Sequence, residues 1–81
     1  MMVRVKLFAA ARELAGASEI GVEVRAGATL ADVERALLAA VPTLERILPH
    51  ARWAVNAEFA ASGAMITDKS EIALIPPVSG G

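Results

Sequence analysis

The sequence predicts an α+β domain in which one main helix packs on one face of a mixed β-sheet. Three observations support this prediction. Apolar and polar residues alternate in two segments near the start of the chain, which is the period of a half-buried strand. A helical stripe of apolar residues lies between positions 29 and 41. A strand-like segment at residues 71–75, apolar from residue 72 onward, then ends at two prolines, as expected of a last strand.

The first third of the chain predicts a strand, a short helix and a second strand. Residues 3–7 alternate valine and leucine with arginine and lysine, so one face of this strand should be buried. Residues 9–15 are good helix formers, and Gly16 is expected to cap their C-terminal end. Isoleucine and valine recur at every second position of residues 18–24, which predicts a second strand that pairs antiparallel with the first.

The main helix is expected to begin at Thr29. Thr29 and Asp32 have the spacing of a capping box, with aspartate in place of the usual glutamate. Pro42 marks the end of the helix, because proline cannot continue the helical hydrogen bonds. The apolar residues share one face, which should lie on the sheet. They are Leu30, Val33, Leu37, Leu38 and Val41.

The remainder of the chain predicts two short strands and a final central one. Residues 52–56 and 58–60 are expected to form the short strands, joined by a tight turn. Met65 and Ile66 are expected to return to the core. Residues 72–75 are apolar in succession, which is typical of a central strand buried on both faces.

This order of elements corresponds to a ubiquitin-like β-grasp, in which the first and last strands lie side by side and parallel. Residues 1–76 are predicted to form the domain, and residues 77–81 are predicted to form a flexible, extended C-terminal tail. Pro76 and Pro77 have no backbone N–H, so the ladder of the last strand cannot continue past Pro76.

The composition excludes several classes of function. A chain of 81 residues forms one small domain, too small for an ordinary cofactor-enclosing enzyme. Eight basic and nine acidic residues give no basic field, which argues against nucleic acid as a partner. The absence of cysteine excludes disulfides and thiolate chemistry. No signal peptide or membrane-spanning run is visible, so a cytoplasmic protein without a membrane partner is expected.

The side chains offer no catalytic or metal-binding constellation. His50 is the only histidine and has no second ligand at a metal-like spacing, so a solvated loop histidine is the better interpretation. The acidic residues lie in separate predicted elements and form no pair for acid-base catalysis. Any chemistry is therefore expected to need a partner and to use the end of the chain.

The predicted tail is suited to enter a pocket of another protein. Extended at about 3.3–3.6 Å per residue, residues 77–81 could reach about 15–18 Å. Gly80 and Gly81 have no Cβ and could pass through a narrow channel. A carboxylate on Gly81 would become an acyl donor once it is joined to AMP. A terminal glycine pair also arises by chance in about one chain in 200, so an inert end is the alternative.

Three blocks of the sequence resemble the small, sulfur-carrier subunit of molybdopterin synthase. They are residues 7–16, 54–56 and 71–81, and the last block, which ends in Ile-Pro-Pro-Val-Ser-Gly-Gly, is the most specific. One departure lies at residues 68–71, where Asp-Lys-Ser-Glu replaces the family's usual Asp-Gly-Asp-Glu. The resemblance implies that an adenylating enzyme uses ATP to activate Gly81 and that a sulfur donor protein converts it to a thiocarboxylate. The chain itself would bind no cofactor and no metal.

The resemblance also implies how the chain meets its partner. The tail would enter the active site of the large synthase subunit and donate sulfur to cyclic pyranopterin monophosphate, within a heterotetramer of two small and two large subunits. The inserted residues would be Pro77, Val78, Ser79 and Gly80, with Gly81 carrying the sulfur. The exposed sheet face near the tail would dock, and burial in the core is the alternative for each candidate. The docking candidates are Phe8, Phe59, Leu74 and Ile75.

Three other functions remain open at this point. A sulfur carrier for thiamine synthesis or tRNA thiolation would use Gly81 in the same way. A ubiquitin-like modifier would instead join Gly81 to lysines of target proteins. A small interaction domain would have an inert tail. The proline pair and the Arg12-Glu13-Leu14 block favour the molybdopterin pathway.

Overall fold

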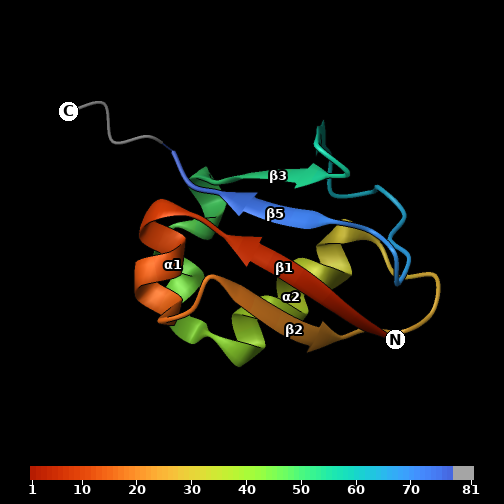
Figure 1. Cartoon of the computed structure of the whole chain (residues 1–81), viewed down its shortest axis with the longest axis horizontal. Coiled ribbons are helices and arrows are strands. Elements are labelled where there is room, and N and C mark those ends of the chain that lie inside the picture. Colours follow the sequence, from red (N-terminus) through yellow and green to blue (C-terminus); the bar gives the residue numbers. More distant parts are fainter. Residues whose placement is uncertain (78–81) are drawn as a thin grey trace.

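The chain forms a five-stranded mixed sheet with its helices on one face, as the computed structural model of residues 1–77 shows (Figure 1). The strand order is β2-β1-β5-β3-β4. Strands β1 and β5 are parallel, and the other pairs are antiparallel. This topology confirms the predicted β-grasp. The elements are β1 (Met2–Leu7), α1 (Ala9–Ala15), β2 (Glu19–Glu23), α2 (Leu30–Ala40), the 3₁₀ helices η1 (Pro42–Arg46) and η2 (Leu48–His50), β3 (Arg52–Val55), β4 (Glu58–Ala60) and β5 (Ile72–Ile75).

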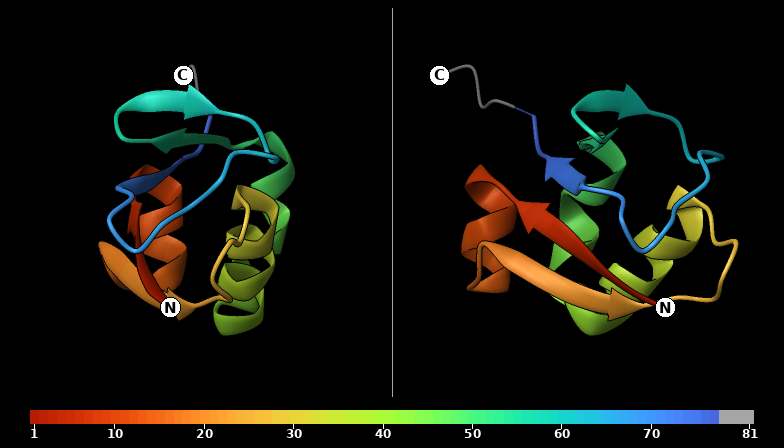
Figure 2. Two further views of the ribbon diagram at one scale, coloured as in Figure 1. Left: turned by 90° about the vertical axis from the view of Figure 1, so that its right-hand side faces the viewer. Right: turned by 45° about the vertical axis from the view of Figure 1, so that its right-hand side comes forward.

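Helix α2 covers one face of the sheet, and no helix covers the opposite face in the part of the chain that the structure describes (Figure 2). Side chains of β1 alternate strictly between these two faces. Val3, Val5 and Leu7 are at most 1% exposed, whereas Arg4 and Lys6 point to solvent. The predicted alternation of the first strand is therefore confirmed. It follows that each strand has an inner, core-facing side and an outer side without a second layer.

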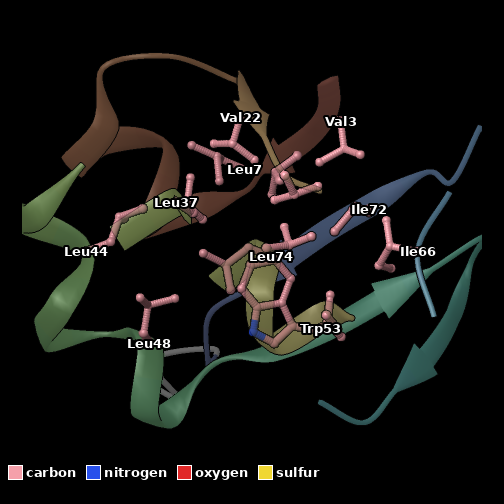
Figure 3. Close-up of a cluster of buried hydrophobic side chains, with 14 of the residues drawn as sticks. Val3, Leu7, Val22, Leu37, Leu44, Leu48, Trp53, Ile66, Ile72 and Leu74 are labelled. Carbon is pink, nitrogen blue, oxygen red and sulfur yellow. The ribbon is translucent and has the colours of Figure 1, made fainter. Parts of the chain in front are cut away.

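The core is aliphatic and is closed at one end by the two 3₁₀ helices. Helix α2 inserts Leu30, Val33 and Leu37, while Leu38 and Val41 of the predicted stripe are only partly buried. The helix ends at Ala40, and the 3₁₀ helices that follow supply further core residues. Figure 3 shows buried side chains that pack together in this core. They include Leu7, Val22, Leu37, Leu44, Leu48, Trp53, Ile72 and Leu74.

Two expectations about burial are wrong. Strand β5 is central but buried on one face only, because Ile72 and Leu74 face the core while Ala73 and Ile75 are partly exposed on the outer side. Met65 does not enter the core and is 66% exposed, whereas Ile66 is 1% exposed. Successive extended residues point in opposite directions, so only one of two neighbouring residues can face the core.

The start of helix α2 predicts a dependence of stability on pH. The Asp32 carboxylate accepts the backbone N–H of Thr29 at 2.9 Å and is paired with the guanidinium groups of Arg35 and Arg25. The Thr29 N–H, followed by Arg35, lowers the pKa of Asp32 from 3.8 to about 2. Because the folded pKa is depressed, this contribution is present above pH 3.8 and is lost as the pH falls towards about 2.

We therefore expect the Asp32→Asn variant to be less stable than the wild type at neutral pH, with the difference shrinking towards pH 2. Urea unfolding followed by circular dichroism at several pH values measures this. An Arg35→Gln variant should weaken the effect without removing it, since the Thr29 N–H remains. A difference in unfolding free energy that stayed constant across this range would contradict the assignment to Asp32.

Candidate functional site

Strand β5 is the last element of the sheet and ends directly before two prolines. The strand ends at Ile75, so the sheet ladder stops at the position that the proline pair predicts. Pro76 is buried and Pro77 is exposed. The structure describes residues up to Pro77. Gly81, the predicted sulfur-bearing residue, and the predicted insertion residues Val78, Ser79 and Gly80 lie outside the described residues. Their roles stay predictions.

An apolar patch lies on the outer face of the sheet next to Ile75. Strand pairing explains how it forms: Ala73 is the register partner of Ala54, and Ala54 is the partner of Phe59, so three adjacent strands place these side chains on one surface. Phe8 joins them from the segment between β1 and α1. We call this surface the outer patch. It is lined by Phe8, Ala54, Ala57, Phe59, Ala73 and Ile75.

The predicted docking residues divide between the outer patch and the core. Phe59 is 62% exposed and Phe8 is 47% exposed, so neither aromatic ring is needed to fill the core. Ile75 is partly buried and lines the patch. Leu74 is 0% exposed and belongs to the core, on the opposite side of β5. For Leu74, the structure therefore supports the alternative of burial in the core, because the alternation of β5 turns it inward.

Cationic side chains border the outer patch. The Arg52 guanidinium lies 3.9 Å from the centroid of the Phe59 ring, and Arg52 is the register partner of Ile75. On the other side, Lys6 of β1 is the register partner of Ala73 and is exposed. Within residues 1–77, neither Arg52 nor Lys6 forms a salt bridge. The patch therefore presents an apolar centre between two positive charges.

The patch can bind a surface but cannot catalyse a reaction. Its phenylalanine, alanine and isoleucine side chains include no nucleophile, acid or base. Residues 1–77 also contain no group of three or more side chains that could hold a metal ion. His50 is exposed at the end of η2. None of the described helices is long and apolar enough to cross a membrane. The geometry indicates recognition of another protein.

Sequence reasoning missed the alanines of the outer patch and its cationic border. A signal for part of them exists in the period of two. Once Ile72 and Leu74 are assigned to the core, Ala73 and Ile75 must point outward. The register between β3 and β5 that brings Ala54 beside Ala73 is a long-range feature, and no local pattern predicts it.

Phe59→Ala should weaken partner binding far more than it weakens the fold. The ring is 62% exposed, so we expect a loss of only about 0.5–1 kcal/mol of unfolding free energy, mostly from the contact with Arg52. An aromatic residue at the centre of an interface is a common hot spot, and the Kd for a docking partner should rise at least about tenfold. Chemical denaturation and titration calorimetry measure the two quantities. A stability loss with unchanged affinity would assign Phe59 to the fold alone.

The chain is similar to known proteins over nearly its whole length. The sequence profile of the ThiS family matches residues 5–81. The molybdopterin synthase sulfur carrier subunit of Arabidopsis thaliana is 34% identical over 79 residues, covering 98% of this chain and 82% of the plant protein. Small archaeal modifier protein 1 of Haloferax volcanii is 39% identical over 84 residues, covering 94% of this chain and 97% of the archaeal one.

Solved structures share the same arrangement of elements. A crystal structure of the Haloferax volcanii modifier aligns over 100% of both chains with a TM-score of 0.91 and 38% identity. A chain in a structure of molybdopterin-converting factor from Helicobacter pylori aligns over 100% of both chains with a TM-score of 0.72 and 27% identity. That structure is a protein–protein complex of subunits 1 and 2 of the factor.

Proposed function

Because this chain belongs to the ThiS family of β-grasp sulfur carriers, we propose that it is the sulfur-carrier subunit of a molybdopterin synthase. The observation that carries the proposal is the extent of the family match, which runs through residue 81 and so includes Gly80 and Gly81. The identity of 34% to the plant sulfur carrier subunit supports this choice of pathway.

In the proposed reaction, Gly81 is the residue that is activated. Its carboxylate attacks the α-phosphorus of ATP on an adenylating enzyme, and pyrophosphate leaves. Hydrosulfide delivered by a donor protein then attacks the acyl carbon, the bond from that carbon to the AMP oxygen breaks, AMP leaves, the S–H proton is lost to solvent, and a thiocarboxylate results. Both steps require catalytic groups of the partners, since the outer patch offers none. ATP is bound by the activating partner and not by this chain.

The outer patch is the proposed docking face for the large synthase subunit. It lies beside Ile75, the last residue of β5, so docking there would hold the following residues close to the partner's active site. Pro77, Val78, Ser79 and Gly80 would then enter that site with the thiocarboxylate of Gly81. The sulfur would be transferred to cyclic pyranopterin monophosphate in a cytoplasmic heterotetramer. The subunit complex from Helicobacter pylori supports a protein partner of this kind.

A second candidate function is a ubiquitin-like protein modifier. It is favoured by the 39% identity to small archaeal modifier protein 1, which exceeds the identity to the plant carrier. In this case the amine of a target lysine attacks the acyl-adenylate of Gly81, AMP leaves, and an isopeptide bond forms. Activation of Gly81 is common to both candidates, which differ only in the nucleophile.

Native co-purification from the organism's own cells tests the two candidates together. Mass spectrometry would identify the bound proteins and the chemical state of Gly81. We expect recovery of a molybdopterin synthase large subunit and a Gly81 in which sulfur replaces one oxygen. Isopeptide-linked targets without a large subunit would support the modifier instead. Recovery of thiazole synthase or a tRNA-thiolating enzyme alone would assign this sulfur carrier to another pathway.

A further inference from the structure

Left-handed backbone is distributed unevenly along this chain. Five residues of the described part have a positive φ. Gly16, at 72°, closes helix α1, and Gly27, at 81°, lies in the loop before α2. Glycine adopts this conformation at little cost, so both positions are as expected. The other three carry side chains at φ values of 48°, 53° and 69°. They are Ala9, Asn56 and Ala57.

The three side-chain-bearing positions all border the outer patch. Ala9 follows Phe8 directly, and Asn56 and Ala57 form the turn between β3 and β4. Ala57 itself lines the patch. Neither Gly16 nor Gly27 does. The chain thus uses glycine for left-handed backbone away from the patch and accepts the steric cost of a Cβ beside it.

Asn56 has a local explanation, and Ala57 has none. The Asn56 side-chain oxygen accepts the Glu71 N–H at 2.9 Å, and the Asn56 N–H donates to the Glu71 carbonyl at 2.8 Å, which fastens the turn to the start of β5. Asparagine also tolerates this conformation well. A two-residue turn of this kind favours asparagine followed by glycine, yet alanine occupies the second position. What alanine adds to this turn is a methyl group on the outer patch.

We propose that Ala57 is a positioning residue of the docking face, and this inference rests on the proposed function. Its methyl group forms part of the surface that receives an apolar side chain of the large subunit. Its restricted backbone also holds the turn, and with it Phe59, in the docking geometry. Arg52 and Lys6 border the patch without a salt bridge in residues 1–77, so the large subunit carries carboxylates around that apolar side chain.

The Ala57→Gly variant should raise stability and lower affinity. Relief of the left-handed strain, less the added freedom of glycine in the unfolded chain, should raise Tm by about 2–6 °C. Loss of one methyl group that the complex would bury should raise the Kd for the large subunit of the same organism about fourfold. A residue with a purely structural role would not move these quantities in opposite senses. Differential scanning calorimetry and titration calorimetry measure them.

Gly16→Ala is the matched control. An added Cβ at Gly16 meets no atom within 4 Å, so the substitution tests the backbone conformation alone. We expect a lower Tm and an unchanged Kd. Arg52→Glu and Lys69→Glu test the charge of the partner, since both side chains are exposed and only Arg52 borders the patch. Arg52→Glu should weaken binding by more than Lys69→Glu.

The outcomes separate this inference from the proposed function. If the wild-type chain does not bind the large subunit, the proposed function fails and the inference fails with it. If the wild type binds and Ala57→Gly binds equally well, the role of Ala57 is overturned while the function stands. A fall in Tm for Ala57→Gly would overturn the assignment of strain. Equal effects of the two charge reversals would overturn the acidic partner surface.

Discussion

Removing Gly80 and Gly81 is expected to abolish thiocarboxylate formation and to leave the unfolding free energy unchanged. Within residues 1–77, the last member of the core cluster is Leu74 and the sheet ladder ends at Ile75, so the two glycines are not expected to add to the core. Gly81 provides the carboxylate that the proposed adenylation requires. The two glycines should therefore matter for chemistry alone. Incubation with the adenylating enzyme, ATP and a sulfur donor, followed by mass spectrometry of the intact chain, measures the loss.

A chain extended by one alanine after Gly81 is the matched control. It keeps both glycines but moves the carboxylate, so it should also fail to become a thiocarboxylate while melting as the wild type does. A Ser79→Ala variant keeps the length and both glycines and should be loaded. If the chain without Gly80 and Gly81 still supported molybdopterin synthesis in cells, the end of the chain would be inert. The sulfur-carrier proposal would then be wrong.

The main elements of the fold could be predicted because each has a local sequence pattern. The period of two in residues 3–7 determines which face of β1 is buried, and Val3, Val5 and Leu7 are indeed in the core. The spacing of Thr29 and Asp32 identified the start of α2, where the Thr29 N–H donates to the Asp32 carboxylate. These features depend on neighbours in sequence, so a single sequence contains them.

Burial in β5 could not be predicted in the same way. Four apolar residues in succession indicate a strand covered on both faces, and this is correct only when a second layer exists. Here no helix covers the outer face within residues 1–77, so Ala73 and Ile75 are left partly exposed. Whether a layer is present depends on the whole topology. Leu74 was a docking candidate for the same reason, since the sequence does not show which face of β5 is covered.

The docking surface is harder to predict because it is assembled from distant segments. Strand pairing brings Ala54 beside Ala73, and the turn of Ala57 completes the surface. Alanine gives no local signal of recognition, since it is a good helix former and is also often buried in cores. The residue type of Ala57 does not indicate its left-handed conformation, since the turn pattern would call for glycine at this position. The pairing of Ala54 with Ala73 and the backbone of Ala57 are both properties of the folded chain.

Leu74→Ala should mainly lower stability and Ile75→Ala should mainly lower affinity, although the two residues are neighbours on β5. Leu74 is fully buried, and its truncation should cost about 2–5 kcal/mol of unfolding free energy. A chain of this length has a total stability of about 4–12 kcal/mol, so the variant should be partly unfolded on mild heating. Ile75 is only partly buried, and its truncation should cost about 1 kcal/mol.

The loss of binding affinity should be larger for Ile75→Ala than for Leu74→Ala, which is the reverse of their order in loss of stability. Ile75 lines the outer patch, and its truncation should raise the Kd for the large subunit about tenfold. Leu74 faces the core, so the folded fraction of Leu74→Ala should bind with nearly wild-type affinity. Calorimetric titration at low temperature, corrected for the folded fraction from circular dichroism, separates the two terms. If Leu74→Ala lost affinity beyond its folded fraction while Ile75→Ala did not, the partner would not bind the outer patch. Because adjacent residues of one strand are compared, a difference in affinity reports which face of the sheet is recognised.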